Sequence, residues 1–390
     1  MTALRAGVVG LGTMGRHHAR VLAAMPGVRL IGACDPAPQA ARHAVAGLPV
    51  FPDLDQLLGL GLDICVVAAP TLAHADIGTR LAQAGVHALI EKPLGASAEE
   101  GRALADAFER AGLVGCVGHI ERFNPVIRAM RDRIARGEIG AVLQVTTSRQ
   151  GPYPRRIRDV GVILDLASHD IDLTRWITGS PYLKVSAVTN QVTGGSSHED
   201  LAAVAGVLED GTVVNHLVNW LSPVKERLVT VTGQLGCLRG DLLAPALRLH
   251  RHGLRSAPDD QAAGPVADNR GVACKLATHE PLRAELEGFV AAVHGRADHI
   301  VPMRAGVEVM DVTSAILSVP RVGVEVPHGG ADIAPPSPER VVAVVPPRPG
   351  EDGAAHGAAF AHAEPPAASH GDLPVLVAGY VPALNSRRFF

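Results

Sequence analysis

The sequence contains no apolar run that approaches the roughly 20 residues needed to span a membrane as a helix. Its first residues, MTALRAGVVGLG, carry one arginine and pass directly into a glycine motif, which is not the pattern of a secretory signal peptide. The five cysteines are dispersed without metal-like spacing, as is typical of free thiols in a reducing compartment. We therefore expect a cytoplasmic protein with no membrane association.

The sequence also lacks a strong excess of charge of either sign. A formal net charge of -3 excludes bulk attraction to nucleic acid, and 47% apolar with 19% charged residues is typical of a globular protein. The 390 residues are enough for two ordinary domains. The neighbouring His17 and His18 have no further ligands at metal spacing, so we predict no metal site.

The first 120 residues alternate between short apolar runs and helical segments. Strands are expected at 5–10, 28–34, 62–68, 86–90 and 113–118, and helices at 13–25, 72–85 and 97–111. Strands that alternate with helices at this spacing predict an α/β fold with a parallel, doubly wound sheet of the Rossmann type, here residues 1–120.

The pattern changes after residue 120. Strands are expected at 140–149, 182–192, 202–208, 212–220 and 226–233, and helices at 161–178, 281–294 and 304–319. Consecutive strands predict a second, α+β domain with a largely antiparallel sheet, residues 121–327. The proline- and alanine-rich residues 328–390 bury too little to offset their chain entropy, so we expect a disordered tail there.

A glycine motif, Gly10-Leu11-Gly12-Thr13-Met14-Gly15, lies between the first expected strand and the first expected helix. In this context Gly10 permits a tight turn, Gly12 lets a pyrophosphate approach the backbone, and Gly15 lets helix and strand pack closely. The start of the helix offers free N–H groups and a partial positive charge to phosphates. The motif therefore predicts a dinucleotide site.

Asp35 identifies the dinucleotide. It ends the second expected strand, 20 residues after Gly15, where a carboxylate can accept hydrogen bonds from the ribose hydroxyls. A carboxylate at this place repels the 2'-phosphate of NADP, and the next residues supply no arginine to bind that phosphate. We predict NAD as the cofactor.

Four further segments recur together in one family. They are Ala68-Ala69-Pro70-Thr71-Leu72-Ala73-His74, Glu91-Lys92-Pro93, Gly118-His119-Ile120-Glu121-Arg122-Phe123-Asn124-Pro125 and Asp165-Leu166-Ala167-Ser168-His169-Asp170-Ile171-Asp172. Residues 4 to about 326 resemble the glucose–fructose oxidoreductase / inositol dehydrogenase (Gfo/Idh/MocA) family. Three other segments, 149–161, 219–227 and 280–282, are similar to its UDP-N-acetylglucosamine 3-dehydrogenase subgroup, whose members oxidise a sugar 3-hydroxyl to a ketone.

The resemblance implies an NAD-dependent oxidoreductase acting on CH–OH groups, with Lys92, Asp165 and His169 as its catalytic set. It also implies a cis peptide bond before Pro93. The implied cofactor contacts are the backbone of Thr13 and Met14, together with Ala69, Pro70, His74, Glu91, Lys92 and Arg122. His74 is equally compatible with a local packing role.

The residue types suit alcohol oxidation, which needs a base for the hydroxyl proton and a hydride acceptor. Lys92 ends a parallel strand, where its ammonium can stabilise a developing alkoxide. Asp165 and His169 are four residues apart on an expected helix and so share a face. The imidazole of His169 suits a general base, and Asp165 can bind the substrate or orient that imidazole. Asp170 and Asp172 are interpreted as structural.

A basic cluster precedes that helix and indicates an anionic substrate. Arginine binds phosphate through a bidentate fork, which favours a nucleotide diphosphate sugar. The residues predicted to bind substrate are Arg149, Arg155, Arg156, Arg158, Lys225 and Arg227. The alternative is a solvated basic loop.

Other interpretations stay open at this point. The substrate can be another polyol, namely an inositol, a free or phosphorylated sugar, a nucleotide ribose with a 3'-hydroxyl or an antibiotic deoxysugar, and the enzyme can run as a ketoreductase. A non-catalytic NAD sensor on the same fold is the second class, although it would not need Lys92 or His169. A homo-oligomer, dimer or tetramer, is expected because one face of the second sheet would otherwise stay exposed and apolar.

Overall fold

The N-terminal sheet consists of six parallel strands in the order β3-β2-β1-β4-β5-β6. The computed structural model describes residues 3–154, 157, 160–193, 198–252, 271–296, 300–318 and 343–344. The strands are β1 (Leu4–Val9), β2 (Val28–Cys34), β3 (Val50–Phe51), β4 (Ile64–Val67), β5 (His87–Glu91) and β6 (Gly115–Gly118). The strand order reverses between β1 and β4, and ligands bind at such a switch point in open α/β sheets. The predicted doubly wound fold is confirmed.

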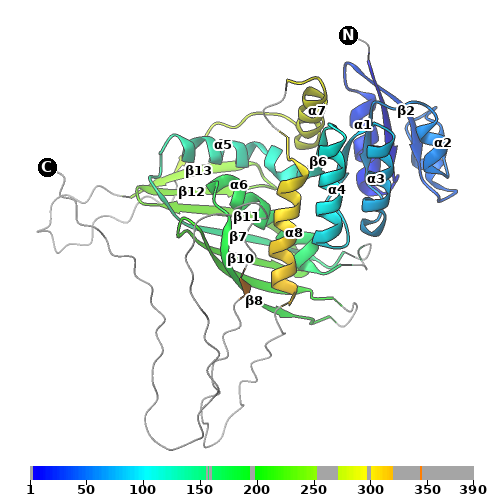
Figure 1. Ribbon diagram of the computed structural model, residues 1–390. Coiled ribbons are helices and arrows are strands. Elements are labelled where there is room, and N and C mark those ends of the chain that lie inside the picture. Colours follow the sequence, from blue (N-terminus) through cyan, green and yellow to red (C-terminus); the bar gives the residue numbers. More distant parts are fainter. Residues whose placement is uncertain are drawn as a thin grey trace, which may run out of the picture. The chain divides into compact units, whose positions relative to one another are not determined.

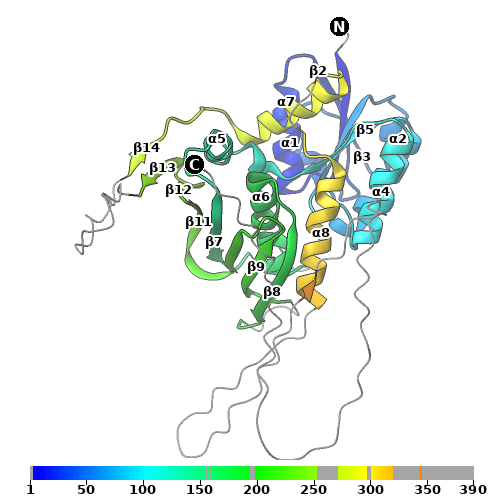
Figure 2. The same ribbon diagram turned by 60° about the vertical axis from the view of Figure 1, so that its left-hand side comes forward.

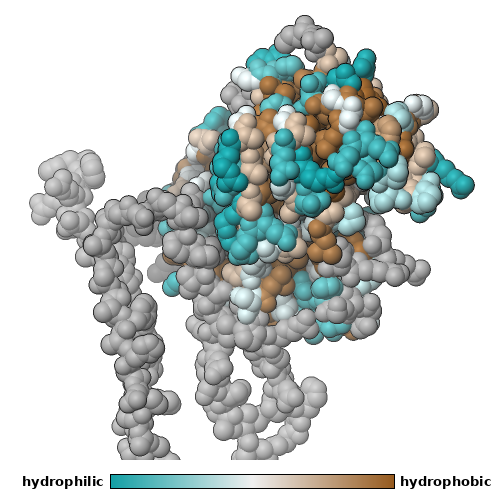
Figure 3. Space-filling view, turned by 45° about the vertical axis from the view of Figure 1, so that its right-hand side comes forward, coloured by the Kyte–Doolittle hydropathy of each residue, from teal (hydrophilic) through white to brown (hydrophobic). Residues whose placement is uncertain are grey.

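Helices cover both faces of this sheet, which is why its strands are apolar throughout rather than alternating (Figures 1 and 2). Neighbouring strand residues such as Val8 and Val9 point into two different cores. The helices are α1 (Thr13–Ala23), α2 (Leu54–Leu58), α3 (His74–Gln83) and α4 (Ala98–Arg110), with short 3-10 turns at Ala40–His43, Thr71–Ala73 and Ile120–Phe123. In Figure 3, polar and apolar residues are mixed over the surface seen from this side.

The second sheet has nine strands in the order β14-β13-β12-β11-β7-β10-β9-β8-β15. They are β7 (Val142–Pro152), β8 (Tyr182–Asn190), β9 (Leu201–Leu208), β10 (Val213–Asn219), β11 (Leu221–Gly233), β12 (Gly236–Asp241), β13 (Ala246–Arg251), β14 (Val272–Ala273) and β15 (Ala343–Val344). Every pair is antiparallel except β7 with β10. The expected α+β architecture with a largely antiparallel sheet is confirmed.

One face of this sheet packs against α5 (Pro125–Ala135), α6 (Ser168–Thr178) and α8 (Met303–Ser318), which share its apolar core. Figures 1 and 2 show these helices on the same side of the strands. Helix α5 was not expected from the sequence, nor were β12 and β13. The start of α5 has a local signal, because the Asn124 side chain accepts a hydrogen bond from Val126 N–H and Pro125 fits the first helical position.

The last two long helices bridge the two sheets. Helix α7 (Pro281–Val293) packs on α1 and places Phe289 in the Rossmann core, while α8 contacts both α4 and α6. Their packing therefore crosses the predicted division at residue 120, which stays a prediction. The predicted tail, 328–390, lies outside the described residues apart from β15, which pairs with β8.

The described residues lack two kinds of structural feature. Among them, no helix is long and apolar enough to cross a membrane. The same residues contain no group of three or more His, Cys, Asp or Glu side chains arranged to hold a metal ion.

Candidate active site

The glycine loop at the end of β1 has the shape of a phosphate cradle. Gly10 has a φ of +86°, and a Cβ there would lie 2.6 Å from the Ala68 carbonyl oxygen. A Cβ at Gly15 would lie 1.7 Å from the Gly10 oxygen, so helix α1 reaches the loop only because this residue is glycine. At Gly12 a Cβ would meet nothing within 4 Å, and no side chain caps the helix that starts at Thr13. The loop thus presents open space and free N–H groups to an anion.

The Asp35 carboxylate is fixed where β2 ends. One oxygen accepts the Leu11 N–H at 2.7 Å and the other accepts the Ala37 N–H at 2.9 Å. These bonds tie the carboxylate to the glycine loop. Each carboxylate oxygen has a second lone pair, so both keep capacity to accept a ribose hydroxyl.

The ring of His74 connects two loops at the carboxyl ends of the parallel strands β4 and β5. Its Nδ1 lies 2.7 Å from the Pro93 carbonyl oxygen and its Nε2 lies 2.8 Å from the Ala69 carbonyl oxygen. The residue is buried, and both ring nitrogens are engaged by backbone. His74 thus ties the Ala69 and Pro93 backbones together, as expected for its local packing role, and its cofactor contact stays a prediction.

Lys92, which follows β5, contacts Asp165, which lies just before α6. The Lys92–Pro93 peptide bond is cis, as the resemblance implied. Lys92 Nζ donates to the Asp165 backbone oxygen at 2.8 Å and lies 3.3 Å from its carboxylate Oδ1. An ammonium has three donors, so a third remains for a substrate oxygen.

The Asp165 carbonyl that accepts this bond lies where the helix changes type. Residues Ile163–Ala167 form a π-helical turn directly before α6, where one continuous helix was expected. Such turns occur often at functional sites. Glu199 fixes the start of the turn by accepting the Ile163 N–H at 3.0 Å, and its carboxylate fills the space that a Cβ at Gly161 would need.

His169 follows Asp165 on the same helix and carries an unprotonated imidazole. Burial, followed by the positive charges of Lys92, Arg149 and Arg227 and by the neighbouring His119, holds the pKa of His169 well below its ordinary value. Its Nδ1 is buried and has no hydrogen-bond partner among the described residues. A neutral imidazole can accept a proton, as a general base must.

This shift predicts the position of the acid limb in the pH profile. Because the pKa of His169 is lowered, its neutral form persists as pH falls below 6.5, its ordinary pKa. We expect kcat/KM to stay constant down through pH 6.5 and to fall only at lower pH. A pH–rate profile checks this, and an acid limb centred at pH 6.5 or above would contradict the assigned environment.

His119 was not predicted from the sequence as a functional residue, although it lies in the segment Gly118 to Pro125 that resembles the family. Its ring is 2% exposed, and burial lowers its pKa to about 4 against the opposing effect of Asp172. It follows β6, directly beside the strand that ends before Lys92. Only its place at the carboxyl end of a parallel strand marked it in the sequence.

Two predicted ligands are engaged inside the protein instead. Arg122, expected near the cofactor, binds Asp172 through two nitrogens. Arg149, expected to bind substrate phosphate, is 3% exposed and donates to Glu121 at 2.8 Å and Asp170 at 2.9 Å. Buried arginines paired in this way hold α6 in place, which agrees with the structural role expected for the two aspartates.

The remaining basic residues divide into three groups. Arg155, Arg156 and Arg158 lie outside the described residues. Lys225 is exposed on an irregular part of β11. Arg227 is partly buried, donates to the Gln150 carbonyl oxygen at 2.7 Å, and is close enough to His169 to affect its titration. Of the predicted substrate ligands, both Arg149 and Arg227 lie close enough to affect the titration of His169, but Arg149 is bound by Glu121 and Asp170, whereas Arg227 donates to backbone oxygens.

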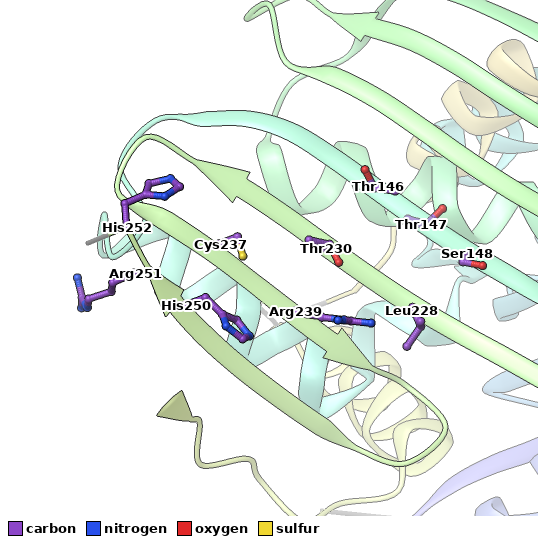
Figure 4. Close-up of a pocket in the computed structure, with 10 residues that line it drawn as sticks. All are labelled: Thr146, Thr147, Ser148, Leu228, Thr230, Cys237, Arg239, His250, Arg251 and His252. Atoms are coloured by element: carbon purple, nitrogen blue, oxygen red, sulfur yellow. The ribbon is translucent and has the colours of Figure 1, made fainter. Parts of the chain in front are cut away.

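A hollow formed by the described residues lies elsewhere. It has a volume of about 690 Å³ and lies on the second sheet, over β7, β11, β12 and β13 (Figure 4). Thr230, Arg239 and His250 are among its lining residues, and none of Lys92, Asp165 or His169 is. We therefore do not assign the chemistry to it.

The buried side of α7 carries an acid, Glu285, whose environment favours the uncharged form. Glu285 on α7 is 3% exposed, and neither carboxylate oxygen has a partner among the described residues. Burial, with a smaller effect of Glu91, raises the pKa of Glu285 well above its ordinary value. Such a group favours folding at low pH, and that advantage is lost as pH rises.

The pH dependence of stability tests this assignment. Between its unfolded and folded pKa values, Glu285 should cost about 1.4 kcal/mol of folding free energy per pH unit. Glu285→Gln should therefore unfold with a shallower pH dependence than wild type from pH 5 to 9 in urea titrations. Glu287→Gln, at an exposed position of the same helix, is the control. Parallel curves for Glu285→Gln and wild type would show that Glu285 is ionised in the folded protein.

Comparisons with known proteins agree with this geometry. Residues 4–119 match the family described as "Oxidoreductase family, NAD-binding Rossmann fold", and residues 127–239 match the "GFO/IDH/MocA C-terminal domain". The UDP-N-acetylglucosamine 3-dehydrogenase of Acidithiobacillus ferrooxidans is 33% identical over 327 residues, which cover 83% of this chain and 98% of that protein. The scyllo-inositol 2-dehydrogenase (NAD(+)) of Bacillus subtilis is 31% identical over 194 residues, 47% of this chain and 56% of that protein.

Solved structures show the same likeness. The A. ferrooxidans UDP-N-acetylglucosamine 3-dehydrogenase has a TM-score of 0.71 at 30% identity, and the match covers 81% of this chain and 97% of that one. GenD2 from gentamicin A biosynthesis, solved in complex with NAD, has a TM-score of 0.67 at 27% identity, with 81% and 94% covered.

Proposed function

Because this chain belongs to the Gfo/Idh/MocA family of NAD-binding oxidoreductases, we propose that it oxidises the 3-hydroxyl of a nucleotide-linked sugar such as UDP-N-acetylglucosamine to the 3-keto sugar. The observation that carries the proposal is the convergence of Lys92, Asp165 and His169 at the carboxyl end of β5. The relative named for this reaction is matched over nearly its whole length, which supports the substrate class.

The residues present fit NAD. The open space at Gly12 and the uncapped start of α1 suit its pyrophosphate, and Asp35 suits a ribose without a 2'-phosphate. Ala69 and Pro70 would border the nicotinamide. When bound, NAD supplies the acceptor for the hydride that leaves the carbinol carbon.

Side chains of this protein would take up the hydroxyl proton and stabilise the developing negative charge. In the proposed reaction, neutral His169 takes the proton of the sugar hydroxyl, and the Lys92 ammonium donates a hydrogen bond to the same oxygen as negative charge develops. Asp165 holds that ammonium through its backbone oxygen and carboxylate. His119 is buried and His169 is partly buried, which would limit the access of water to the reacting atoms.

Arg227 and Lys225 are proposed to receive the diphosphate, with Arg155, Arg156 and Arg158 as further candidates. Arg227 acts on the titration of His169 and donates to backbone oxygens, so its charge is available to an anionic substrate, which favours such a substrate over a neutral polyol. The inositol dehydrogenases among the relatives make a neutral polyol the second candidate.

An absorbance assay separates these substrates. Purified protein with NAD and UDP-N-acetylglucosamine, at mildly alkaline pH with a ketone trap, should form NADH, while scyllo- and myo-inositol should give far lower kcat/KM. Faster turnover of an inositol would move the assignment to the second candidate. No turnover of either class, with NAD binding intact, would contradict sugar oxidation altogether.

We also propose that the protein is a homo-oligomer, dimer or tetramer, formed through the uncovered face of the nine-stranded sheet. Helices α5, α6 and α8 pack on the other face. On the central strands β7 and β10, the exposed side chains of this face include Thr146, Val213 and Leu217, none of which is charged, and the face includes the hollow of Figure 4. Sheet faces of this kind are commonly covered by a second subunit.

A charge on that face should disrupt the assembly. Leu217→Glu places a carboxylate on β10, and we expect light scattering with size-exclusion chromatography to report a smaller particle than wild type. Leu72→Glu, at a position that is 78% exposed near the first sheet, should leave the size unchanged. Unaltered assembly of Leu217→Glu would move the interface elsewhere.

A further inference from the structure

A buried pair of side chains connects the phosphate-binding helix with the strand that ends at Lys92. His18 lies on the buried side of α1, less than one turn after Gly15, and is 0% exposed. Its Nε2 is 2.8 Å from Oε1 of Glu91, the last residue of β5. None of the roles described above uses His18.

Glu91 in turn contacts the backbone of Lys92. Its second oxygen, Oε2, accepts the Lys92 N–H at 3.3 Å. A Cβ at Gly118, its partner on β6, would come within 3.0 Å of the same oxygen, so the glycine leaves room for the carboxylate. Burial raises the pKa of Glu91, but the hydrogen bond and charge of His18 and the charge of Lys92 outweigh it, and the pKa is lowered overall.

The surroundings make this pair the main polar contact of a largely apolar region. Phe289 and Leu286 of α7 and Leu22 of α1 are fully or almost fully buried in the same core. Glu285 of α7 faces Glu91 closely enough to affect its own titration. Loss of the His18 donor would leave a buried carboxylate next to Lys92 without its strongest hydrogen bond, which is costly in an apolar environment.

We propose that His18 is a positioning residue: it fixes the Glu91 carboxylate, and Glu91 fixes the backbone of Lys92, so that helix α1 and Lys92 are held in one geometry. The inference rests on the role of Lys92 in the proposed function. It explains why a histidine is buried on the face of α1 that otherwise carries apolar residues. Because α1 also holds the cofactor phosphates, the pair sets the distance between the bound dinucleotide and the ammonium.

Variants at position 18 separate positioning from folding. Gln places its amide nitrogen near the Nε2 position of histidine, so His18→Gln should keep kcat within a few-fold of wild type. His18→Leu removes the donor and should lower kcat about 10- to 100-fold, since a misplacement of about 1 Å can cost that much. The Kd for NADH, measured by fluorescence, should change much less than kcat.

A second readout does not need the sugar substrate. The rate at which a small acylating reagent modifies the Lys92 amine, measured by peptide mass spectrometry relative to exposed Lys184, should change in His18→Leu and be restored in His18→Gln. If wild type turns over no sugar, the proposed function fails, yet this labelling still decides the positioning role.

Two control variants complete the test. His17→Gln alters the exposed neighbour on the same helix and should change neither readout. Leu22→Ala removes a fully buried side chain of α1 and should lower the melting temperature without changing kcat or Lys92 labelling. If His18→Leu behaves like Leu22→Ala, with lost stability but wild-type kcat and labelling, the histidine has only a structural role and the proposal is overturned.

Discussion

Replacing Lys92 with methionine should lower kcat about 1,000-fold while NAD still binds. Methionine keeps the length and apolar stem of lysine but removes the ammonium that would stabilise the developing alkoxide, and loss of one such donor costs about 10²- to 10³-fold. The hydrogen bonds to the Asp165 oxygens disappear with it, which adds to the loss. Steady-state NADH formation gives kcat, and NADH fluorescence titration gives the Kd.

For the prediction to hold, kcat must fall while the Kd for NADH changes little. The Kd should stay within a few-fold of wild type, because the glycine loop and Asp35 are unchanged. Lys184→Met, at an exposed position on β8, is the matched control and should be indistinguishable from wild type. A Lys92→Met enzyme with more than a tenth of wild-type kcat would remove the ammonium from the chemistry.

Replacing His169 with asparagine should lower kcat/KM by about 10²- to 10⁴-fold, the usual range for loss of a general base. Asparagine fills much of the same space but cannot take a proton near neutral pH. The residual rate should rise with hydroxide concentration and should no longer show the acid limb expected below pH 6.5. The pH profile of the variant, measured beside wild type, provides this comparison.

His17→Asn makes the same substitution at an exposed position and should keep the wild-type profile. Should the acid limb survive in His169→Asn, another group titrates there, and His119 would become the candidate because it is also buried near Lys92. Full activity of His169→Asn would eliminate His169 as the base.

The parallel sheet and the cofactor type could be predicted from the sequence because the features that decide them are local. The motif from Gly10 to Gly15 forces a tight turn and close packing, and the structure shows both through the contacts that a Cβ would make. Asp35 follows its strand directly, so its place beside the loop depends on few other residues. Alternating elements then leave little choice but a parallel sheet.

Roles that depend on burial could not be predicted in the same way. Arg149 lies in a basic cluster in the sequence, yet Glu121 and Asp170, distant along the chain, come to it in the fold. His74 reaches two backbone oxygens that only the folded loops bring together. A charge pattern shows which side chains are present but not which of them will be paired.

The same limit explains what was missed. His18 meets Glu91, which is distant along the chain, and Glu285 comes near Glu91 only because α7 returns to pack on α1. The π-helical turn before α6 is bonded at its start by Glu199, more than 30 residues later. The same turn carries the Asp165 oxygen that accepts the Lys92 ammonium.

The most direct test follows the hydrogen itself. UDP-N-acetylglucosamine carrying deuterium at C3 of the sugar is incubated with the protein and NAD, and the nicotinamide product is examined by mass spectrometry and NMR. Hydride transfer at C3, supported by Lys92 and His169, predicts NADH that carries one deuterium, formed in wild type and almost absent in Lys92→Met. Formation of unlabelled NADH would show that another carbon is oxidised, and no NADH with NAD bound would contradict the proposed reaction.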